Sequence, residues 1–243
     1  MLRSGRVWWD CFASLADASD LAISVPARFM HRRRHGLRCD IDAGRVRCRQ
    51  DIEKASTMRP IDRFLSLVGA EVSAAATDYA RSAGLRVAAL LAEAPAPADT
   101  LPPQRLGVCR HLAAACAEMR PDLAAAFKAL EPELAWRTRT MSNASSGFAE
   151  GHASARVLDQ TGLEQRGGLV SGLSLIAPGI TYPEHNHPPE EIYLVLSAGE
   201  WWQAGRGWHA YGPGGIVHNP PNIRHAMRGT TVPLLAIWFL LPS

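Results

Sequence analysis

Gly179-Ile-Thr-Tyr-Pro-Glu-His-Asn-His-Pro-Pro-Glu-Glu-Ile-Tyr-Leu-Val-Leu-Ser-Ala-Gly199 is the stretch that decides the fold of this chain. His185 and His187 are two residues apart, so on an extended strand both imidazoles leave the same face. The pair Pro188-Pro189 cannot continue a central strand, and it resets the direction of the backbone. The sequence therefore predicts a strand that presents two imidazoles on one face.

A second strand is predicted directly after the proline pair. Its alternation places Glu191, Tyr193 and Val195 on one face and the apolar residues between them on the other. His225 can join this group from a later strand. Imidazoles and a carboxylate that converge on one point are typical of a divalent-metal site, here with a phenol beside it.

Composition and charge exclude several classes of partner. The chain has 243 residues, of which 47% are hydrophobic and 20% charged, and this is ordinary for a globular protein. No apolar run approaches the roughly 18–20 residues that span a bilayer, so we expect no membrane partner. Residues 1–57 hold 11 basic and 7 acidic residues, a net of +4, and the remainder holds 15 and 16, a net of −1. A nearly neutral folded part predicts no nucleic-acid partner.

The cysteines and the first residues bear on location. The five cysteines are an odd number and none has the C-x-x-C spacing of a zinc knuckle. The first residues lack the apolar core of a secretory signal. Both features predict a cytoplasmic protein.

The chain divides into three parts by pattern. Residues 1–57 show no sustained apolar period, so we expect a disordered leader, or sequence upstream of a true start at Met58. Residues 58–135 predict Ala-rich helices, over 61–92 as one helix or a broken pair, over 104–119 and over 122–130. Residues 136–243 predict a β-domain with strands at 155–158, 168–176, 191–196, 200–204, 215–219, 224–229 and 234–240. Short strands separated by regular turns are typical of a sandwich or barrel.

The spacing of the site residues resembles that of a known family. Gly179-x5-His185-x-His187-x3-Glu191, followed by Gly199, resembles the first cupin motif, although the last glycine arrives one residue later than usual. Gly-Pro-Gly-Gly at 212–215 and Asn-Pro-Pro-Asn-Ile-Arg-His225 resemble the second motif, with Asn222 where glycine is commonest.

The cupin resemblance implies a fold and a metal. Cupins fold as a double-stranded β-helix, a jelly-roll barrel, so we expect a mainly β protein in which this barrel follows an α-helical segment. The implied ligands of one divalent transition metal are His185, His187, Glu191 and His225. Three imidazoles and one carboxylate suit Fe, Mn, Zn, Ni or Co, and the donor set does not select among them.

Further residues narrow the resemblance to the cupin-type dimethylsulfoniopropionate lyases. These are Tyr182-Pro-x-His-x-His-x-x-x-Glu-x-Tyr193, the Gly151-His152-Ala153 segment, His225-Ala-Met and Pro233-Leu-Leu-Ala-x-Trp238. The likeness covers about residues 134–241. It implies a carbon–sulfur lyase that splits its small-molecule substrate into acrylate and dimethyl sulfide by β-elimination. It further implies Tyr193 as the catalytic base and Tyr182 and Trp238 as substrate contacts.

Two other functional classes stay open. A cupin dioxygenase or isomerase acting on another small carboxylate would need the metal but not Tyr193. A non-catalytic cupin that binds a metal or small ligand would keep His185 and His187 without turnover of any sulfonium compound. Cupins often dimerise through the barrel, so a homodimer is also compatible with the resemblance. Glu190 is expected to face away from the site, and His152 is expected to be structural.

Overall fold

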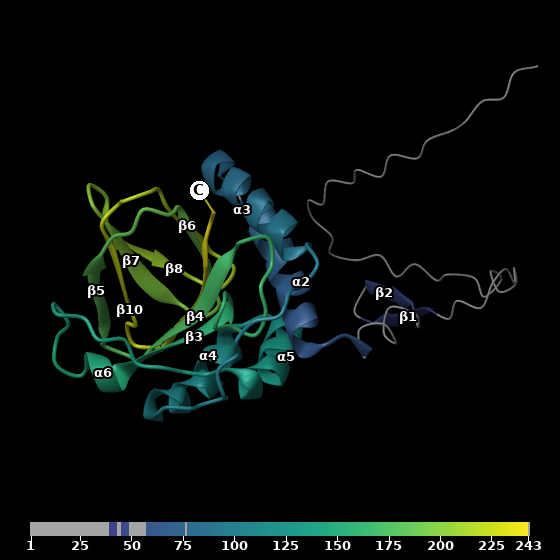
Figure 1. Cartoon of the computed structure of the whole chain (residues 1–243), viewed down its shortest axis with the longest axis horizontal. Coiled ribbons are helices and arrows are strands. Elements are labelled where there is room, and N and C mark those ends of the chain that lie inside the picture. Colours follow the sequence, from purple (N-terminus) through teal and green to yellow (C-terminus); the bar gives the residue numbers. More distant parts are fainter. Residues whose placement is uncertain (1–38, 43–44, 49–56, 76, 243) are drawn as a thin grey trace, which may run out of the picture. The chain divides into compact units, whose positions relative to one another are not determined.

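The computed structural model describes residues 39–42, 45–48, 57–75 and 77–242, which belong to two compact units (Figure 1). In the first unit, strands β1 (Cys39–Asp42) and β2 (Arg45–Cys48) pair antiparallel. The rest of the leader predicted for residues 1–57 lies almost entirely outside the described residues. The second unit holds both the helices and the barrel, and the boundary predicted at 135/136 stays a prediction.

The helical segment of the second unit consists of short helices. They are α2 (Pro60–Ser73), α3 (Asp78–Leu91), the 3-10 turn η1 (Gly107–His111), α4 (Leu112–Glu118), α5 (Pro121–Leu130) and the 3-10 turn η2 (Glu131–Glu133). Helices α2 and α5 each begin with a proline, whose fixed φ suits the first turn and whose missing N–H is not needed there. The hydroxyl of Thr77 caps α3 by accepting a hydrogen bond from the backbone N–H of Ala80.

Two helix boundaries show how non-local contacts change a sequence pattern. The long pattern over 61–92 is a pair of helices, which is the second of the two predicted forms. The helix predicted over 104–119 begins only at η1, because Gln104 is held by backbone hydrogen bonds with Leu134 and Trp136. Periodicity along the chain does not reveal such a partner 30 residues away.

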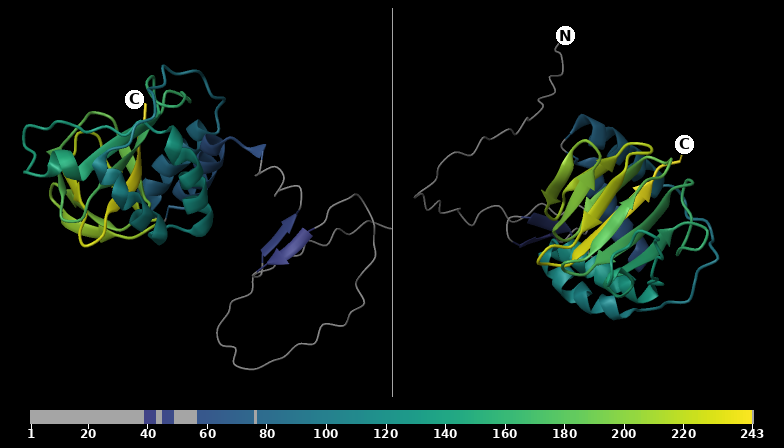
Figure 2. Two further views of the ribbon diagram at one scale, coloured as in Figure 1. Left: turned by 90° about the horizontal axis from the view of Figure 1, so that it is seen from below. Right: turned by 90° about the vertical axis from the view of Figure 1, so that its left-hand side faces the viewer.

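Nine antiparallel strands form two sheets that face each other (Figure 2). One sheet has the order β3 (His152–Leu158), β4 (Val170–Ile176), β11 (Leu234–Leu240), β6 (Glu191–Val195) and β9 (Ile216–Asn219). The other has the order β5 (Thr181–His185), β10 (His225–Arg228), β7 (Gly199–Gln203) and β8 (Gly207–Tyr211). A four-residue helix, α6 (Phe148–Gly151), leads into β3. The predicted barrel after an α-helical segment is confirmed.

The two faces of β6 contact two different cores, as the alternation of the sequence predicts. Ile192 and Leu194 are fully buried in a core shared with the helices, which cover the five-stranded sheet (Figure 1). Tyr193 and Val195 are buried in a second core between the two sheets. The barrel interior therefore carries the polar face of β6, and this face leads directly to the predicted site.

Two strands of the four-stranded sheet differ from the sequence predictions. Strand β8 was not predicted, because it is half-buried or exposed along its whole length and shows no apolar alternation. Strand β5 forms where a strand carrying His185 and His187 was predicted, but it ends at His185. Among the described residues, no helix is long and apolar enough to cross a membrane.

Candidate active site

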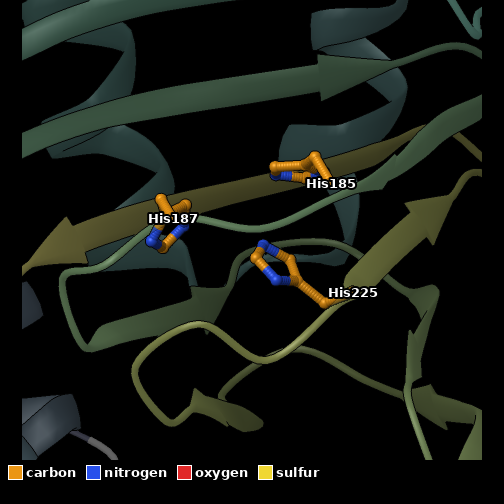
Figure 3. A group of neighbouring side chains, drawn as sticks. All are labelled: His185, His187 and His225. Carbon is orange, nitrogen blue, oxygen red and sulfur yellow. The ribbon is translucent and has the colours of Figure 1, made fainter.

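Three imidazoles converge inside the barrel mouth (Figure 3). His185 is the last residue of β5 and His225 the first of β10, and the two are cross-strand partners. His187 lies two residues beyond the end of β5. One ring nitrogen from each of the three comes within 4.8 Å of the others. The sequence prediction of one convergent imidazole group is thus met in the geometry.

Each of these imidazoles is oriented by a backbone carbonyl two residues away. The Nδ1 atom lies 2.9 Å from the carbonyl oxygen in all three cases: Pro183 for His185, Pro189 for His187 and Ile223 for His225. A carbonyl oxygen only accepts, so Nδ1 donates and carries the proton of the neutral ring. The Nε2 lone pair of each ring is then left for another partner. This is how proteins fix the tautomer of a metal-binding histidine.

Glu191 places a carboxylate against two of these nitrogens. Its Oε2 lies 3.3 Å from Nε2 of His187 and 3.2 Å from Nε2 of His225. Both Nε2 atoms are buried and have no hydrogen-bond partner among the described residues. Three electron-rich atoms therefore face one another, an arrangement that requires a cation between them, either a proton or a metal ion. The set of three imidazole nitrogens and one carboxylate oxygen fits a divalent transition metal.

The acid–base balance of the cluster also suits a cation. Burial alone would raise the pKa of Glu191, but its close contacts with His187 and His225 and the charge of these rings lower it to about 2. The pKa of His187 is raised mainly by the contact of its Nε2 with the Glu191 carboxylate at 3.3 Å. Burial, followed by the charge of His225, lowers the pKa of His185 to about 4. At neutral pH the cluster therefore contains an anionic carboxylate and a neutral His185.

The second motif holds the loop that carries His187. Asn222 has φ 62° and donates a backbone hydrogen bond of 2.9 Å to the carbonyl oxygen of His187. Asparagine tolerates this left-handed conformation better than other residues that have a side chain, which explains why it can replace the commoner glycine. His187 itself is in a loop and not on the strand from which its orientation was predicted. It reaches the cluster through its contacts with Asn222 and Pro189.

Tyr193 lies beside the cluster on the inner face of β6, as its parity with Glu191 predicts. Its side chain is 2% exposed. Burial raises the pKa of its phenol well above the ordinary value, and the charge of Glu191 raises it further. Tyr182 is also buried, with its ring centroid 4.7 Å from that of His185. The two phenols are thus close to the proposed ligands and screened from bulk water.

Trp238 is the cross-strand partner of Tyr193 on one side and of Gly172 on the other. Its ring passes so close to Gly172 that a Cβ there would lie 2.5 Å from Trp238 Cζ2. The guanidinium of Arg156 lies 4.9 Å from the ring centroid. Trp238 is therefore held in place from two sides.

A cavity of about 390 Å³ brings these residues together. Its lining includes all the predicted site residues except His225: Tyr182, His185, His187, Glu191, Tyr193 and Trp238. His225 is 1% exposed and does not belong to the cavity lining. Arg137, Arg139 and Arg156 also line the cavity and were not predicted from the sequence. Arg137 and Arg139 belong to the segment before β3 and Arg156 to β3 itself, and no sequence motif marks any of them.

Two residues near the site have structural contacts. Glu190 faces away from the cluster, where it forms an ion pair with Arg86 at 2.7 Å and a hydrogen bond with Nε2 of His218 at 2.8 Å. His152 is fully buried and stacks on Phe148 at a centroid distance of 4.8 Å. The expectations for Glu190 and His152 agree with these positions.

Two buried amides that were not predicted from the sequence extend the cluster, one through a direct contact and the other through the first. Asn219 Nδ2 donates a hydrogen bond of 2.9 Å to Glu191 Oε2, and Gln203 Nε2 donates one of 2.6 Å to Asn219 Oδ1. Asn219 ends a predicted strand with inward parity, which is the one sequence signal for it. Its hydrogen-bond partners Glu191 and Gln203 could be found only from the register between strands.

Comparisons with known proteins place the chain in a family. The dimethylsulfoniopropionate lyase family model matches residues 79–236. The chain belongs to the dimethylsulfoniopropionate lyase family. Dimethylsulfoniopropionate lyase DddQ of Ruegeria pomeroyi is 31% identical over 149 residues, which cover 57% of this chain and 74% of that protein. A putative dimethylsulfoniopropionate lyase DddL of Cereibacter sphaeroides is 37% identical over 57 residues, 24% of each chain.

Solved structures of the lyase family share the fold. A structure reported for the DMSP lyases RdDddP and RnDddQII matches with a TM-score of 0.63 and 22% identity, over 76% of this chain and 93% of that one. The crystal structure of DddQ from Ruegeria pomeroyi matches with a TM-score of 0.61 and 21% identity, over the same shares. At these identities the likeness shows the fold and carries no further conclusion.

Proposed function

We propose that this member of the dimethylsulfoniopropionate lyase family is a metal-dependent carbon–sulfur lyase that cleaves dimethylsulfoniopropionate. The observation that carries the proposal is the convergence of three imidazoles and Glu191 beside Tyr193 in one cavity. Family membership supplies the substrate class. The products are acrylate and dimethyl sulfide.

His185, His187, Glu191 and His225 are the proposed metal ligands. The tautomer of each imidazole suits this role, because Nδ1 donates its proton to a backbone carbonyl oxygen and the Nε2 lone pair can bind a metal ion. A divalent ion bound there would supply Lewis-acid stabilisation of the substrate carboxylate and would favour the ionised form of a nearby phenol.

Tyr193 is the proposed base. In the elimination, the base takes a proton from the carbon next to the carboxylate, and the electron pair of that C–H bond forms the new C=C bond. The neighbouring C–S bond then breaks, and its electron pair leaves on sulfur as neutral dimethyl sulfide. Tyr193 is buried and lies two residues from Glu191 on the same face of β6. Its phenolate would meet the α-proton without competition from bulk water.

Trp238 and Tyr182 are the proposed contacts to the sulfonium. Trp238 and Tyr193 are cross-strand partners, and the Cβ atoms of such a pair are about 4.5–5.5 Å apart. A substrate whose α-carbon meets Tyr193 therefore has its sulfonium within reach of the indole. A sulfonium carries no hydrogen-bond donor, so an aromatic face is a suitable partner for it.

The metal assignment is tested by elemental analysis of purified variants. We expect about one divalent transition metal per chain in the wild type and loss of most of it in His225→Ala, because the remaining site opens to water. His209→Ala is the matched control, since His209 is exposed on β8. Full metal retention in His225→Ala would refute the four-ligand assignment.

The role of Tyr193 is tested by Tyr193→Phe, which removes the hydroxyl and keeps the ring. Metal content and melting temperature should survive, while kcat falls by about 10²–10⁴-fold with far less change in KM. Tyr211→Phe on β8 is the matched control, because its ring packs on Trp201 outside the cavity lining. Near-normal turnover by Tyr193→Phe would refute Tyr193 as the base and would indicate that another group, such as Tyr182, takes the proton.

A further inference from the structure

A chain of buried amides connects Glu191 to the turn between β7 and β8. Asn219 is fully buried and Gln203 is 4% exposed. Asn219 Nδ2 donates to Glu191 Oε2 at 2.9 Å, and Gln203 Nε2 donates to Asn219 Oδ1 at 2.6 Å. At the outer end, Arg206 Nη1 donates to Gln203 Oε1 at 3.3 Å. The carboxylate of Glu191 is thus tied to the surface through two side-chain amides.

The strand register places each amide beside a proposed ligand. Asn219 on β9 is the cross-strand partner of Glu191 on β6, in the five-stranded sheet. Gln203 on β7 is the cross-strand partner of His225 on β10, in the four-stranded sheet. The hydrogen bond between Asn219 and Gln203 therefore joins the two sheets directly behind the site.

The direction of these hydrogen bonds is set from outside the site. Gln203 Nε2 also lies 2.7 Å from the backbone carbonyl oxygen of His218, which can only accept. The amide nitrogen of Gln203 must therefore face Asn219, so Asn219 turns its oxygen toward Gln203 and its NH₂ toward Glu191. The Glu191 oxygen that faces Asn219 is therefore an acceptor, and an ionised carboxylate, the form that binds metal ions, meets this requirement with either oxygen.

We propose that Asn219 and Gln203 are positioning residues that hold the Glu191 carboxylate in its ligand orientation, and that the donor direction of the amide chain sets the metal affinity. The terminal torsion of a glutamate is broad, so packing alone does not fix it. Tyr193 and Glu191 are two residues apart on the same face of β6, so without Asn219 the carboxylate is free to turn toward the phenol. This inference rests on the proposed metal site.

The test measures Co²⁺ affinity by competition with a chelator, together with the visible absorption of the bound ion, which reports its ligand set. Loss of an outer partner of a metal ligand typically weakens affinity about 10–100-fold, and we expect this of Asn219→Ala. Gln203→Glu keeps the size of the side chain but replaces its donor by an acceptor. It should also weaken affinity about 10–100-fold, because Asn219 then turns its own oxygen toward Glu191.

Two controls separate positioning from damage to the fold. Gln165→Glu makes the same chemical change where Gln165 Nε2 donates to the carbonyl oxygen of Pro97, outside the cavity lining, and should leave Co²⁺ affinity unchanged. In an Asn219→Ala background, Gln203→Glu should have no further effect, because Gln203 acts through Asn219. If Asn219→Ala does not fold, the nearly isosteric Gln203→Glu carries the test alone.

The outcomes are distinguishable. Wild-type affinity in both Asn219→Ala and Gln203→Glu would overturn the positioning role and leave the metal site intact. Equal losses from Gln203→Glu in both backgrounds would overturn the route through Asn219. A wild-type protein that does not bind Co²⁺, Fe²⁺, Mn²⁺, Ni²⁺ or Zn²⁺ at all would overturn the proposed metal site, and the positioning role with it.

Discussion

Replacing Gly172 by alanine should displace Trp238 and destabilise the barrel. Gly172 is in the middle of β4, between β3 and β11, so its backbone is held by strands on both sides. An added Cβ would lie 2.5 Å from Trp238 Cζ2 and 2.6 Å from the carbonyl oxygen of Ala155. Carbon atoms in contact are normally about 3.5–4.0 Å apart, so the indole must retreat by about 1 Å.

The size of the effect follows from the cost of overpacking. Inserting a methyl group into a packed interior costs about 1–3 kcal/mol, and at about 2–4 °C per kcal/mol the melting temperature should fall by about 2–12 °C. The matched control is Gly212→Ala, where an added Cβ meets nothing within 4 Å. Scanning calorimetry gives both melting temperatures, and KM for the substrate should rise in Gly172→Ala alone. Identical melting and KM for Gly172→Ala and the wild type would refute the placement of Trp238.

Three further predictions concern the leader, a buried histidine and the pocket aromatics. A chain that starts at Met58 should match the full chain in melting temperature and metal content, and a large loss of stability would show that residues 1–57 pack on the barrel. Burial and the charge of Arg139 lower the pKa of His152 from 6.5 to about 3. As the pH falls below 6.5, the unfolded chain therefore binds a proton at His152 that the folded protein does not bind, and the folded state loses stability. Between pH 7 and pH 5, at constant metal content, the free energy of unfolding of the wild type should therefore fall by up to about 2 kcal/mol more than that of His152→Leu. Urea denaturation measures both values, and equal falls in the two proteins would contradict the buried neutral state of His152. Tyr182→Phe and Trp238→Phe should mainly raise KM in steady-state assays, whereas a kcat loss as large as that of Tyr193→Phe would point to a role in the chemical step.

The local pattern of the sequence was enough to predict the face on which the site lies. The alternation of Glu191, Tyr193 and Val195 with apolar residues matches the two cores on either side of β6. A one-residue slip would have turned this whole face toward the helices, so a buried strand of this kind encodes its own orientation. His225, predicted to join from a later strand, is the third imidazole of the cluster.

Features that depend on pairing between distant strands could not be predicted in the same way. Strand β8 is exposed and shows no alternation. The contact of Asn219 with Glu191 requires the β6–β9 register. The approach of Trp238 to Gly172 requires the β4–β11 register. These relations come from topology, which one-dimensional periodicity does not contain.

The proposed elimination of dimethylsulfoniopropionate in this cavity can be measured directly through its two products. The most direct test supplies the purified, metal-loaded protein with dimethylsulfoniopropionate under anaerobic conditions. Dimethyl sulfide is then measured in the headspace and acrylate in solution. We expect both products in equal amounts, at a rate that is the same when oxygen is admitted. Turnover that consumes oxygen would indicate a dioxygenase, and the absence of dimethyl sulfide from a protein with full metal content would contradict the proposed function.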